Sequence, residues 1–247
     1  MLPNRFKALL GRKYYGHARD ERQLPPSKFS HSIIIPFATY SPWGDDPAFL
    51  ENFNKVRGNT LVDMYRAYEL WALVGQTASL GGDILEVGVW RGGTGCLMGA
   101  RAQADGRSST VFLCDTFTGV VKAGVEDTHY KGGEHSDTSL DIVRKLAADM
   151  SLRNIEVLQG IFPDESSSAI ENRQFSLCHV DVDAYQSAQG VVEWVWPRLK
   201  VGGIVIYDDY GFHTCEGITQ LVNERSRVAG SVTLHNLNGH AVVIKTA

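Results

Sequence analysis

The chain has 247 residues, of which 43% are hydrophobic and 21% charged, and its formal net charge is −4. This size and composition are typical of one large α/β domain with its own core, and no second domain is required. Because the net charge is negative and no long basic run occurs, we expect no nucleic-acid partner. No apolar run approaches the roughly 20 residues of a membrane span, so we expect no membrane partner either.

The cysteines indicate a reducing environment. They are far apart in the sequence and none forms a C-x-x-C pair, which argues against a zinc site. Cys114 and Cys178 lie within apolar patterns typical of strands, where a free cysteine usually packs as a small hydrophobic residue. The apolar stretch at residues 6–10 is too short for a signal peptide. We therefore expect a reduced, cytoplasmic protein.

Residues 1–60 have the least regular pattern of the chain. The sequence FKALLGRKYYGH is basic and aromatic, and we expect a short helix, a lid, an oligomer contact or a flexible terminus there. Pro25 and Pro26 break any helix in that region, whereas Asp46 followed by Pro47 indicates a helix start. The prediction is an irregular N-terminal segment over residues 1–60, followed by one domain over residues 61–247.

A longer helix is predicted from Thr60, because apolar residues recur at helical spacing from Leu61 to Ala72. The pair Gly81-Gly82 ends it. We expect this part of the chain to form a helical cover over a sheet.

From residue 83 onward, strand patterns alternate with helix patterns. Strands are predicted at residues 84–89, 110–115, 154–159, 175–181, 204–208, 231–236 and 240–245. Helices are predicted from Thr94 and at residues 138–150, 164–171, 184–199 and 215–228. This alternation is typical of a doubly wound α/β fold on a parallel sheet. Asn238-Gly239 is a tight-turn signal, so the last two of the seven strands are predicted to form an antiparallel hairpin.

A glycine-rich stretch, DILEVGVWRGGTGC, connects the first strand to its helix. Glycines at 88, 92, 93 and 95 let backbone N–H groups approach a ligand without an intervening Cβ. Their spacing does not fit the G-x-G-x-x-G pattern of dinucleotide-binding folds. Glu86 is suited to accept a hydrogen bond from an ammonium group or a ribose, and E-x-G-x-x-x-G-G resembles the first motif of S-adenosylmethionine (SAM) methyltransferases. A glycine-rich turn without a ligand is the competing interpretation.

Polar residues also end the next two strands. In an open parallel sheet, ligands bind beyond the carboxyl ends of the strands. Asp115 ends the second strand, where an acid can bind ribose hydroxyls. Gln159 and Gly160 end the third, where a polar side chain can face an adenine.

Four acids end the fourth and fifth strands: Asp181 and Asp183 in HVDVDAY, and Asp208 and Asp209 in IYDDY. On adjacent strands, roughly 4.8 Å apart, their carboxylates would repel one another unless a counter-charge is present. Oxygen ligands without Cys or His point to Mg²⁺, or alternatively to Ca²⁺ or Mn²⁺. A purely structural role is also open, in which Asp183 and Asp209 cap the helices that follow them.

Five motifs together resemble the macrocin O-methyltransferase family: EVGVWRGG, DTFTG, GIFPD, HVDVDAYQS and LKVGGIVIYDDYG. The resemblance covers roughly residues 60–245. It implies a Rossmann-like class I methyltransferase fold and an enzyme that uses SAM and Mg²⁺. Many members methylate sugar hydroxyls of macrolide and aminocoumarin natural products.

The resemblance also implies a role for individual residues. Asp183 would be the general base, and the metal ligands would be Asp181, Asp208 and Asp209. The SAM-binding residues would be Glu86, Gly88, Trp90, Arg91, Asp115, Thr116, Phe117, Gln159, Gly160 and Asp181.

The expected reaction is methyl transfer from SAM to a hydroxyl of a sugar or polyol in a natural-product pathway. A metal bound to that oxygen and to its neighbour would favour a glycoside or a vicinal diol, and a catechol satisfies the same geometry. A nicotinamide-dependent reductase and a non-catalytic SAM-binding subunit are two competing hypotheses. Residues 119–137 depart from the family pattern, so the acceptor stays open, and we expect a homo-oligomer.

Three histidines differ in their predicted roles. His135 and His213 lie on predicted loops and are candidates for a base or a substrate contact, with a surface role the stronger interpretation. His179 lies within a predicted strand, and we expect it to be a core residue.

Overall fold

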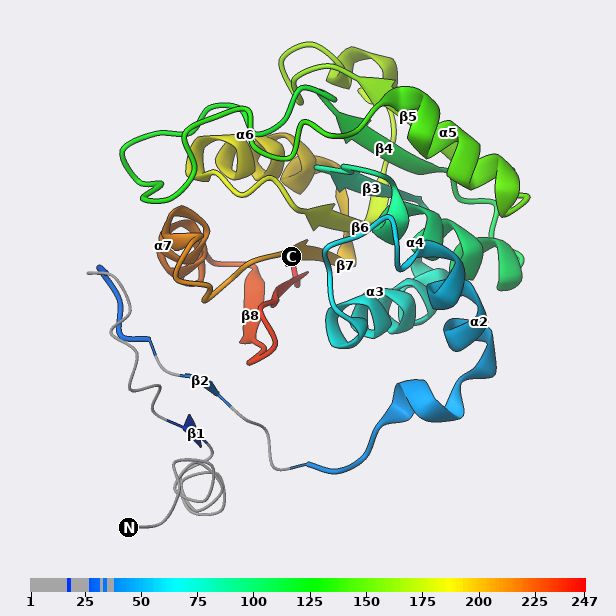
Figure 1. The fold of residues 1–247 in the computed structure, drawn as a ribbon, viewed down its shortest axis with the longest axis horizontal. Coiled ribbons are helices and arrows are strands. Elements are labelled where there is room, and N and C mark those ends of the chain that lie inside the picture. The colour runs from blue at the N-terminus through cyan, green and yellow to red at the C-terminus, as the bar shows by residue number, and fades with distance from the viewer. Residues whose placement is uncertain (1–16, 19–26, 32, 35–37) are drawn as a thin grey trace.

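A computed structural model describes residues 17–18, 27–31, 33–34 and 38–247 (Figure 1). Most of the basic and aromatic segment, and the proline pair at 25–26, lie outside the described residues. Within the described part, β1 (His17–Ala18) pairs antiparallel with β2 (Ile33–Ile34), apart from the main sheet. The lid and oligomer-contact roles of residues 1–60 therefore stay predictions.

Seven strands form the main sheet, in the order β5-β4-β3-β6-β7-β9-β8. The first five in this order pair in parallel, and β9 pairs antiparallel with both β7 and β8. The prediction of a doubly wound sheet with a final antiparallel hairpin is thus confirmed. The strands are β3 (Asp83–Val87), β4 (Val111–Asp115), β5 (Ile155–Gln159), β6 (Phe175–Val180), β7 (Leu199–Tyr207), β8 (Ser231–His235) and β9 (Ala241–Lys245).

Helices precede the sheet and connect its strands. Asp46 caps the first of them by accepting a hydrogen bond from the backbone N–H of Phe49, as its position before Pro47 predicted. The α-helices are α2 (Pro47–Val56), α3 (Met64–Gln76), α4 (Gly93–Ala104), α5 (Leu140–Asp149), α6 (Tyr185–Val195) and α7 (Glu216–Arg225).

The central strands β3, β4 and β6 bury both of their faces, because alternate side chains enter two different cores. Leu85 and Phe112 point into a core with α6 and α7. Ile84 and Leu113 point into the opposite core, with α3, α4 and α5 (Figure 1). Both helical layers therefore fix the positions of the central strands β3, β4, β6 and β7, whose carboxyl ends were predicted to hold the site.

The helix predicted from Thr60 begins later, at Met64. The Asp63 side chain accepts hydrogen bonds from the backbone N–H groups of Tyr65 and Arg66 and so caps α3. Thr60 instead accepts from the N–H of Val62 in the preceding turn. The later start places Arg66 in the first turn of α3.

The helix predicted at 184–199 ends earlier than expected, and the strand predicted at 204–208 begins earlier than expected. The α-helix ends at Val195, and a 3₁₀ turn containing Pro197 follows (Trp196–Arg198), because proline disfavours continuation of the helix. β7 then begins at Leu199, and its register with β6 shifts so that the glycine pair at 202–203 lies inside the strand. The helix predicted at 164–171 is only a short 3₁₀ turn (Ser167–Ile170).

Candidate functional site

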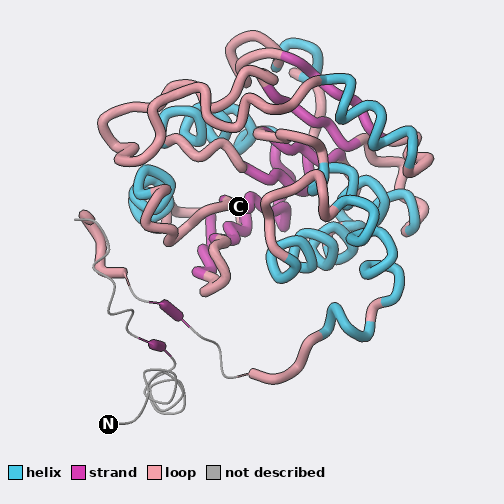
Figure 2. Tube along the Cα trace, in the orientation of Figure 1, coloured by secondary structure: helices cyan, strands magenta, loops and turns pink. Residues whose placement is uncertain are grey.

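One cavity lies at the carboxyl edge of the sheet. It holds about 1130 Å³ of empty space, its open mouth included, which is enough for a cofactor-sized ligand. Residues from the segment between β4 and α5 form one wall, and Figure 2 shows that this segment is a loop throughout. Nine of the residues predicted from the sequence line the cavity: Gly88, Trp90, Asp115, Thr116, Gly160, Asp181, Asp183, Asp208 and Asp209.

The glycine-rich loop approaches the end of β6 very closely. A Cβ added to Gly88 would lie 1.6 Å from the backbone carbonyl oxygen of Asp181, and the φ of Gly88 is 86°. Only glycine fits both the contact and the backbone conformation. The loop after β3 and the loop after β6 therefore face the same cavity.

Asp115 organises this loop through its carboxylate. One oxygen accepts from the backbone N–H groups of Val89 and Trp90, at 2.7 and 2.8 Å, and the other accepts from Phe117 at 2.6 Å. A carboxylate has about four acceptor positions, so these bonds leave capacity for a ligand hydroxyl in the cavity.

Asp137, which the sequence did not single out, holds the other side of the loop. Its carboxylate accepts from the Trp90 indole N–H at 2.9 Å and pairs with the Arg91 guanidinium at 2.7 Å. Arg91 also lies over the indole ring. Arg91 is therefore engaged with Asp137 and Trp90 and does not line the cavity.

Three more predicted SAM-binding residues lie outside the cavity lining. Glu86 is fully buried, and its carboxylate is 2.9 Å from His179 Nδ1. Phe117 packs against a core cluster. Gln159 is exposed at the end of β5. These residues do not join the group that faces the cavity.

The four acids at the ends of β6 and β7 do come together. Ligand oxygens of Asp181, Asp208 and Asp209 all lie within 4.8 Å of one another. Asp183 and Asp209 have φ values of 59° and 60°, a conformation that costs a non-glycine residue about 1–3 kcal/mol and is typical of functional sites. The predicted helix caps are not seen in the described residues, because α6 and α7 have Ala184 and Cys215 at their N-caps without a side-chain cap bond.

Arg66, which was not predicted from the sequence, supplies a counter-charge to these acids. Its guanidinium contacts Asp208, lies 3.3 Å from Asp209 Oδ1, and bonds to Asp63 at 2.8 Å. The Arg66 side chain is only 8% exposed. Neither the helical pattern around Arg66 nor its distance from Asp208 in the sequence marks this role.

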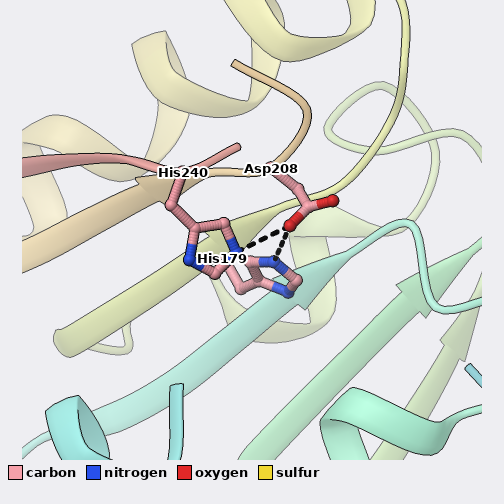
Figure 3. Close-up of side chains that lie close together, drawn as sticks. All are labelled: His179, Asp208 and His240. Atoms are coloured by element: carbon pink, nitrogen blue, oxygen red, sulfur yellow. Dashed lines mark hydrogen bonds and ion pairs between the residues drawn. The ribbon is translucent and has the colours of Figure 1, made fainter. Parts of the chain in front are cut away.

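Two histidines complete the surroundings of Asp208, and Figure 3 shows both rings directed at one of its oxygens. Asp208 Oδ1 is 2.6 Å from His240 Nε2 and 3.6 Å from His179 Nε2. The prediction that His179 is a core residue is correct for its burial, but the ring also contacts the acid cluster. His240 was not predicted, because its position just after the hairpin turn carries no sequence signal.

These contacts divide the acids into two classes. Burial and then the charge of Asp208 raise the pKa values of Asp181 and Asp209 well above the usual range. Burial also tends to raise the pKa of Asp208, but the two imidazoles and the guanidinium outweigh it and lower that pKa. For His179, burial favours the neutral ring, yet its contacts with Asp208 and Glu86 raise its pKa to about 10.

Asp183 lies between the acid cluster and the loop wall. Burial is the main cause of its raised pKa. Cys215 Sγ lies 3.9 Å from its Oδ1, and the pKa of the nearby Tyr130 phenol is raised by burial and then by the charge of Asp183. His135 also lines the cavity, whereas His213 is exposed beside His31.

The carboxylate cluster fits a hard divalent cation. Two of its three members have raised pKa values, so the protein alone does not compensate their charges fully, and oxygen donors are the ligands that Mg²⁺ prefers. All four cysteines are free and buried. Within the described residues, no helix is long and apolar enough to cross a bilayer.

Comparison with known proteins gives the family. Residues 57–243 match the sequence profile of the Macrocin-O-methyltransferase (TylF) family. The 8-demethyl-8-(2,3-dimethoxy-alpha-L-rhamnosyl)-tetracenomycin-C 4'-O-methyltransferase of Streptomyces olivaceus is 31% identical over 65% of this chain and 64% of its own length. The mycinamicin III 3''-O-methyltransferase of Micromonospora griseorubida is 30% identical over 70% of this chain and 74% of its own.

A solved structure agrees with this assignment. The O-methyltransferase NovP superposes with a TM-score of 0.66 and 25% identity, covering 76% of this chain and 83% of NovP. The chain spans slightly less than two thirds of the length of the tetracenomycin relative. The family predicted from the five motifs is confirmed: this chain belongs to the macrocin O-methyltransferases.

Proposed function

We propose that this protein is a SAM- and Mg²⁺-dependent O-methyltransferase that methylates a hydroxyl of a sugar or polyol in a natural-product pathway. The observation that carries the proposal is the placement of the glycine-rich loop and the acid cluster on one cavity. The names of the relatives support the acceptor class, because they describe enzymes that methylate a tetracenomycin derivative and mycinamicin III.

The SAM end of the cavity is assigned to the loops after β3, β4 and β5. Gly88 permits close approach of the backbone, and Asp115 offers its remaining acceptor position to a ribose hydroxyl. Trp90, Thr116 and Gly160 complete this wall. Arg91 and Phe117 act on SAM indirectly in this proposal, because they contact the cavity-lining residues Trp90 and Asp115. Glu86 acts at one further remove, through His179. Gln159 is assigned to the adenine end only from its place at the end of β5.

Asp181, Asp208 and Asp209 are the residues that would hold Mg²⁺. When bound, the ion would neutralise the crowded carboxylates and lower the pKa of an acceptor hydroxyl. All three aspartates line the cavity, next to the wall assigned to SAM, so an acceptor seated there would lie close to the methyl donor.

Asp183 is the proposed general base. It lines the cavity beside the acid cluster, and its raised pKa makes it a better proton acceptor than an ordinary carboxylate when ionised. Its positive φ of 59° is a strained conformation that is typical of functional sites.

The cytoplasmic location and the homo-oligomer also stay proposals. Four free, buried cysteines agree with a reducing compartment. Size-exclusion chromatography with light scattering measures the oligomeric state directly.

Calorimetric titration of SAM into the purified protein, with Mg²⁺ and then with EDTA, tests the cofactor pair, and NADPH serves as the control for a reductase. Micromolar SAM binding and a separate Mg²⁺ signal that disappears in Asp208→Ala are expected. An acceptor screen among glycosylated natural products and catechols then identifies the substrate class. Lack of SAM binding would overturn the proposal, and methylation of catechols alone would replace the sugar acceptor.

A further inference from the structure

A line of three side chains leads from α3 to the acid cluster. Glu69 Oε2 lies 2.6 Å from His240 Nδ1, and His240 Nε2 lies 2.6 Å from Asp208 Oδ1. The three residues come from α3, from the turn before β9 and from the end of β7. His240 has no exposed surface, and Asp208 is 3% exposed.

His240 contacts one carboxylate oxygen of Asp208, and the other oxygen lies toward the acid cluster. His240 bonds to Oδ1, which Figure 3 shows turned toward the two imidazole rings. Oδ2 contacts Arg66 through the same guanidinium nitrogen that lies 3.3 Å from Asp209 Oδ1. Oδ2 therefore faces the neighbouring acids, and Oδ1 faces the protein interior.

Glu69 is itself held in place. It accepts hydrogen bonds from the side-chain amides of Asn236 and Asn238, in the turn between β8 and β9. The turn, the helix and His240 are thus fixed to one another by hydrogen bonds to a single carboxylate. The two ring nitrogens of His240 thus face two carboxylates, one of Glu69 and one of Asp208, so the ring links α3 to the acid cluster.

We infer that Glu69 and His240 are positioning residues that hold Asp208 with Oδ2 presented for a divalent cation. This inference rests on the proposed function, because it assigns the cation to the three-aspartate cluster. Side chains that hydrogen-bond a metal ligand fix its orientation, and their loss typically lowers metal affinity by about 10- to 100-fold.

Two substitutions of His240 separate positioning from simple packing. In His240→Gln the side-chain amide nitrogen reaches the place of Nε2 and keeps a donor toward Asp208. In His240→Asn the amide nitrogen takes the place of Nδ1 and keeps a donor only toward Glu69. Both variants replace a buried ring by a polar amide, so each is the control for the general cost of the replacement.

Mn²⁺ is the probe, and its binding is followed by electron paramagnetic resonance from the loss of the free-ion signal. Calorimetric titration of SAM and the thermal unfolding midpoint check that each variant is folded. We expect His240→Asn, and Glu69→Leu, which leaves the His240 ring without a partner at Nδ1, to weaken Mn²⁺ binding by about 10- to 100-fold, while His240→Gln stays within a few-fold of the parent protein and SAM affinity is unchanged.

The results distinguish two kinds of failure. If the parent protein binds Mn²⁺ and Asp208→Asn abolishes that binding, but His240→Asn and His240→Gln bind equally well, the positioning role is wrong and the metal site stands. If the parent protein binds SAM but no Mn²⁺, the metal part of the proposed function fails, and this inference fails with it.

Discussion

One guanidinium nitrogen of Arg66 contacts both Asp208 and Asp209, so the first turn of α3 supplies positive charge to the carboxyl edge of the sheet. This positive charge partly compensates the repulsion among the acids that the sequence predicted. The proposed divalent cation would therefore contact the same carboxylates as Arg66 does.

Removal of this charge should make stability depend on the metal. In Arg66→Met we expect a loss of about 3–5 kcal/mol in the free energy of unfolding with EDTA present, because a buried charge pair loses one partner. With saturating Mg²⁺ the loss should be smaller, since a cation among the acids replaces part of the charge. Urea unfolding under both conditions measures the difference.

Arg91→Met is the matched control for Arg66→Met, because Arg91 pairs with the exposed Asp137. It should cost at most about 1 kcal/mol, with or without Mg²⁺. An Arg66→Met loss that is the same in EDTA and in Mg²⁺ would contradict the shared role of the arginine and the ion.

The pH dependence of stability should reflect the protonation of His179. Its folded-state pKa of about 10 exceeds its ordinary value of 6.5, so the folded state binds the proton more tightly than the unfolded chain. This contribution is fully present below pH 6.5 and is lost as pH rises through about 10. Asp181 and Asp209 also have raised pKa values, so their contribution to stability also falls as pH rises. That fall begins at a lower pH, near the pKa of an ordinary carboxyl group.

Urea unfolding at intervals between pH 6 and pH 10, in EDTA, measures this slope. We expect stability of the parent protein to fall across the interval and the fall to be shallower in His179→Gln, which has no titrating ring. A slope that does not change in this variant would show that His179 does not hold its proton in the folded state.

Asp183→Asn should separate chemistry from binding. The amide keeps the size of the side chain but cannot act as a base toward the hydroxyl of the acceptor. General-base catalysis typically contributes about 10²- to 10⁴-fold to the rate. We expect methyl transfer to fall by that factor while SAM and Mn²⁺ affinities stay nearly unchanged. The exposed Asp164, which pairs with Lys122, provides the control Asp164→Asn. Retained turnover in Asp183→Asn would exclude the assigned base.

The sequence predicted the strands and the acid cluster because both depend on local patterns. Apolar runs mark β3, β4, β6 and β7, and in a parallel sheet the residues that follow them meet at one edge. The contact between Glu86 and His179 also follows from the strand order, since the two residues are directly paired across β3 and β6. That pairing is visible only once the strand order is known.

What the sequence did not predict comes from contacts between distant parts of the chain. Arg66 lies 142 residues before Asp208, and His240 lies 32 residues after it. A single arginine on an amphipathic helix and a histidine after a turn have many possible partners. The start of β7 was predicted too late because Gly202 and Gly203 resemble a break, whereas the bulge in register with β6 accommodates them.

Gly88→Ala should disrupt the junction between the glycine-rich loop and the acid cluster. The added Cβ would lie 1.6 Å from the Asp181 carbonyl oxygen, so β3 and β6 must separate, and we expect a loss of at least about 2 kcal/mol in unfolding free energy together with loss of SAM binding. Gly106→Ala is the control, because Gly106 also has a positive φ, 67°, but a Cβ there meets no atom within 4 Å. Thermal unfolding and SAM calorimetry of the two variants separate the steric contact from backbone strain. Equal effects in both would mean that the close approach at Gly88 does not control the site.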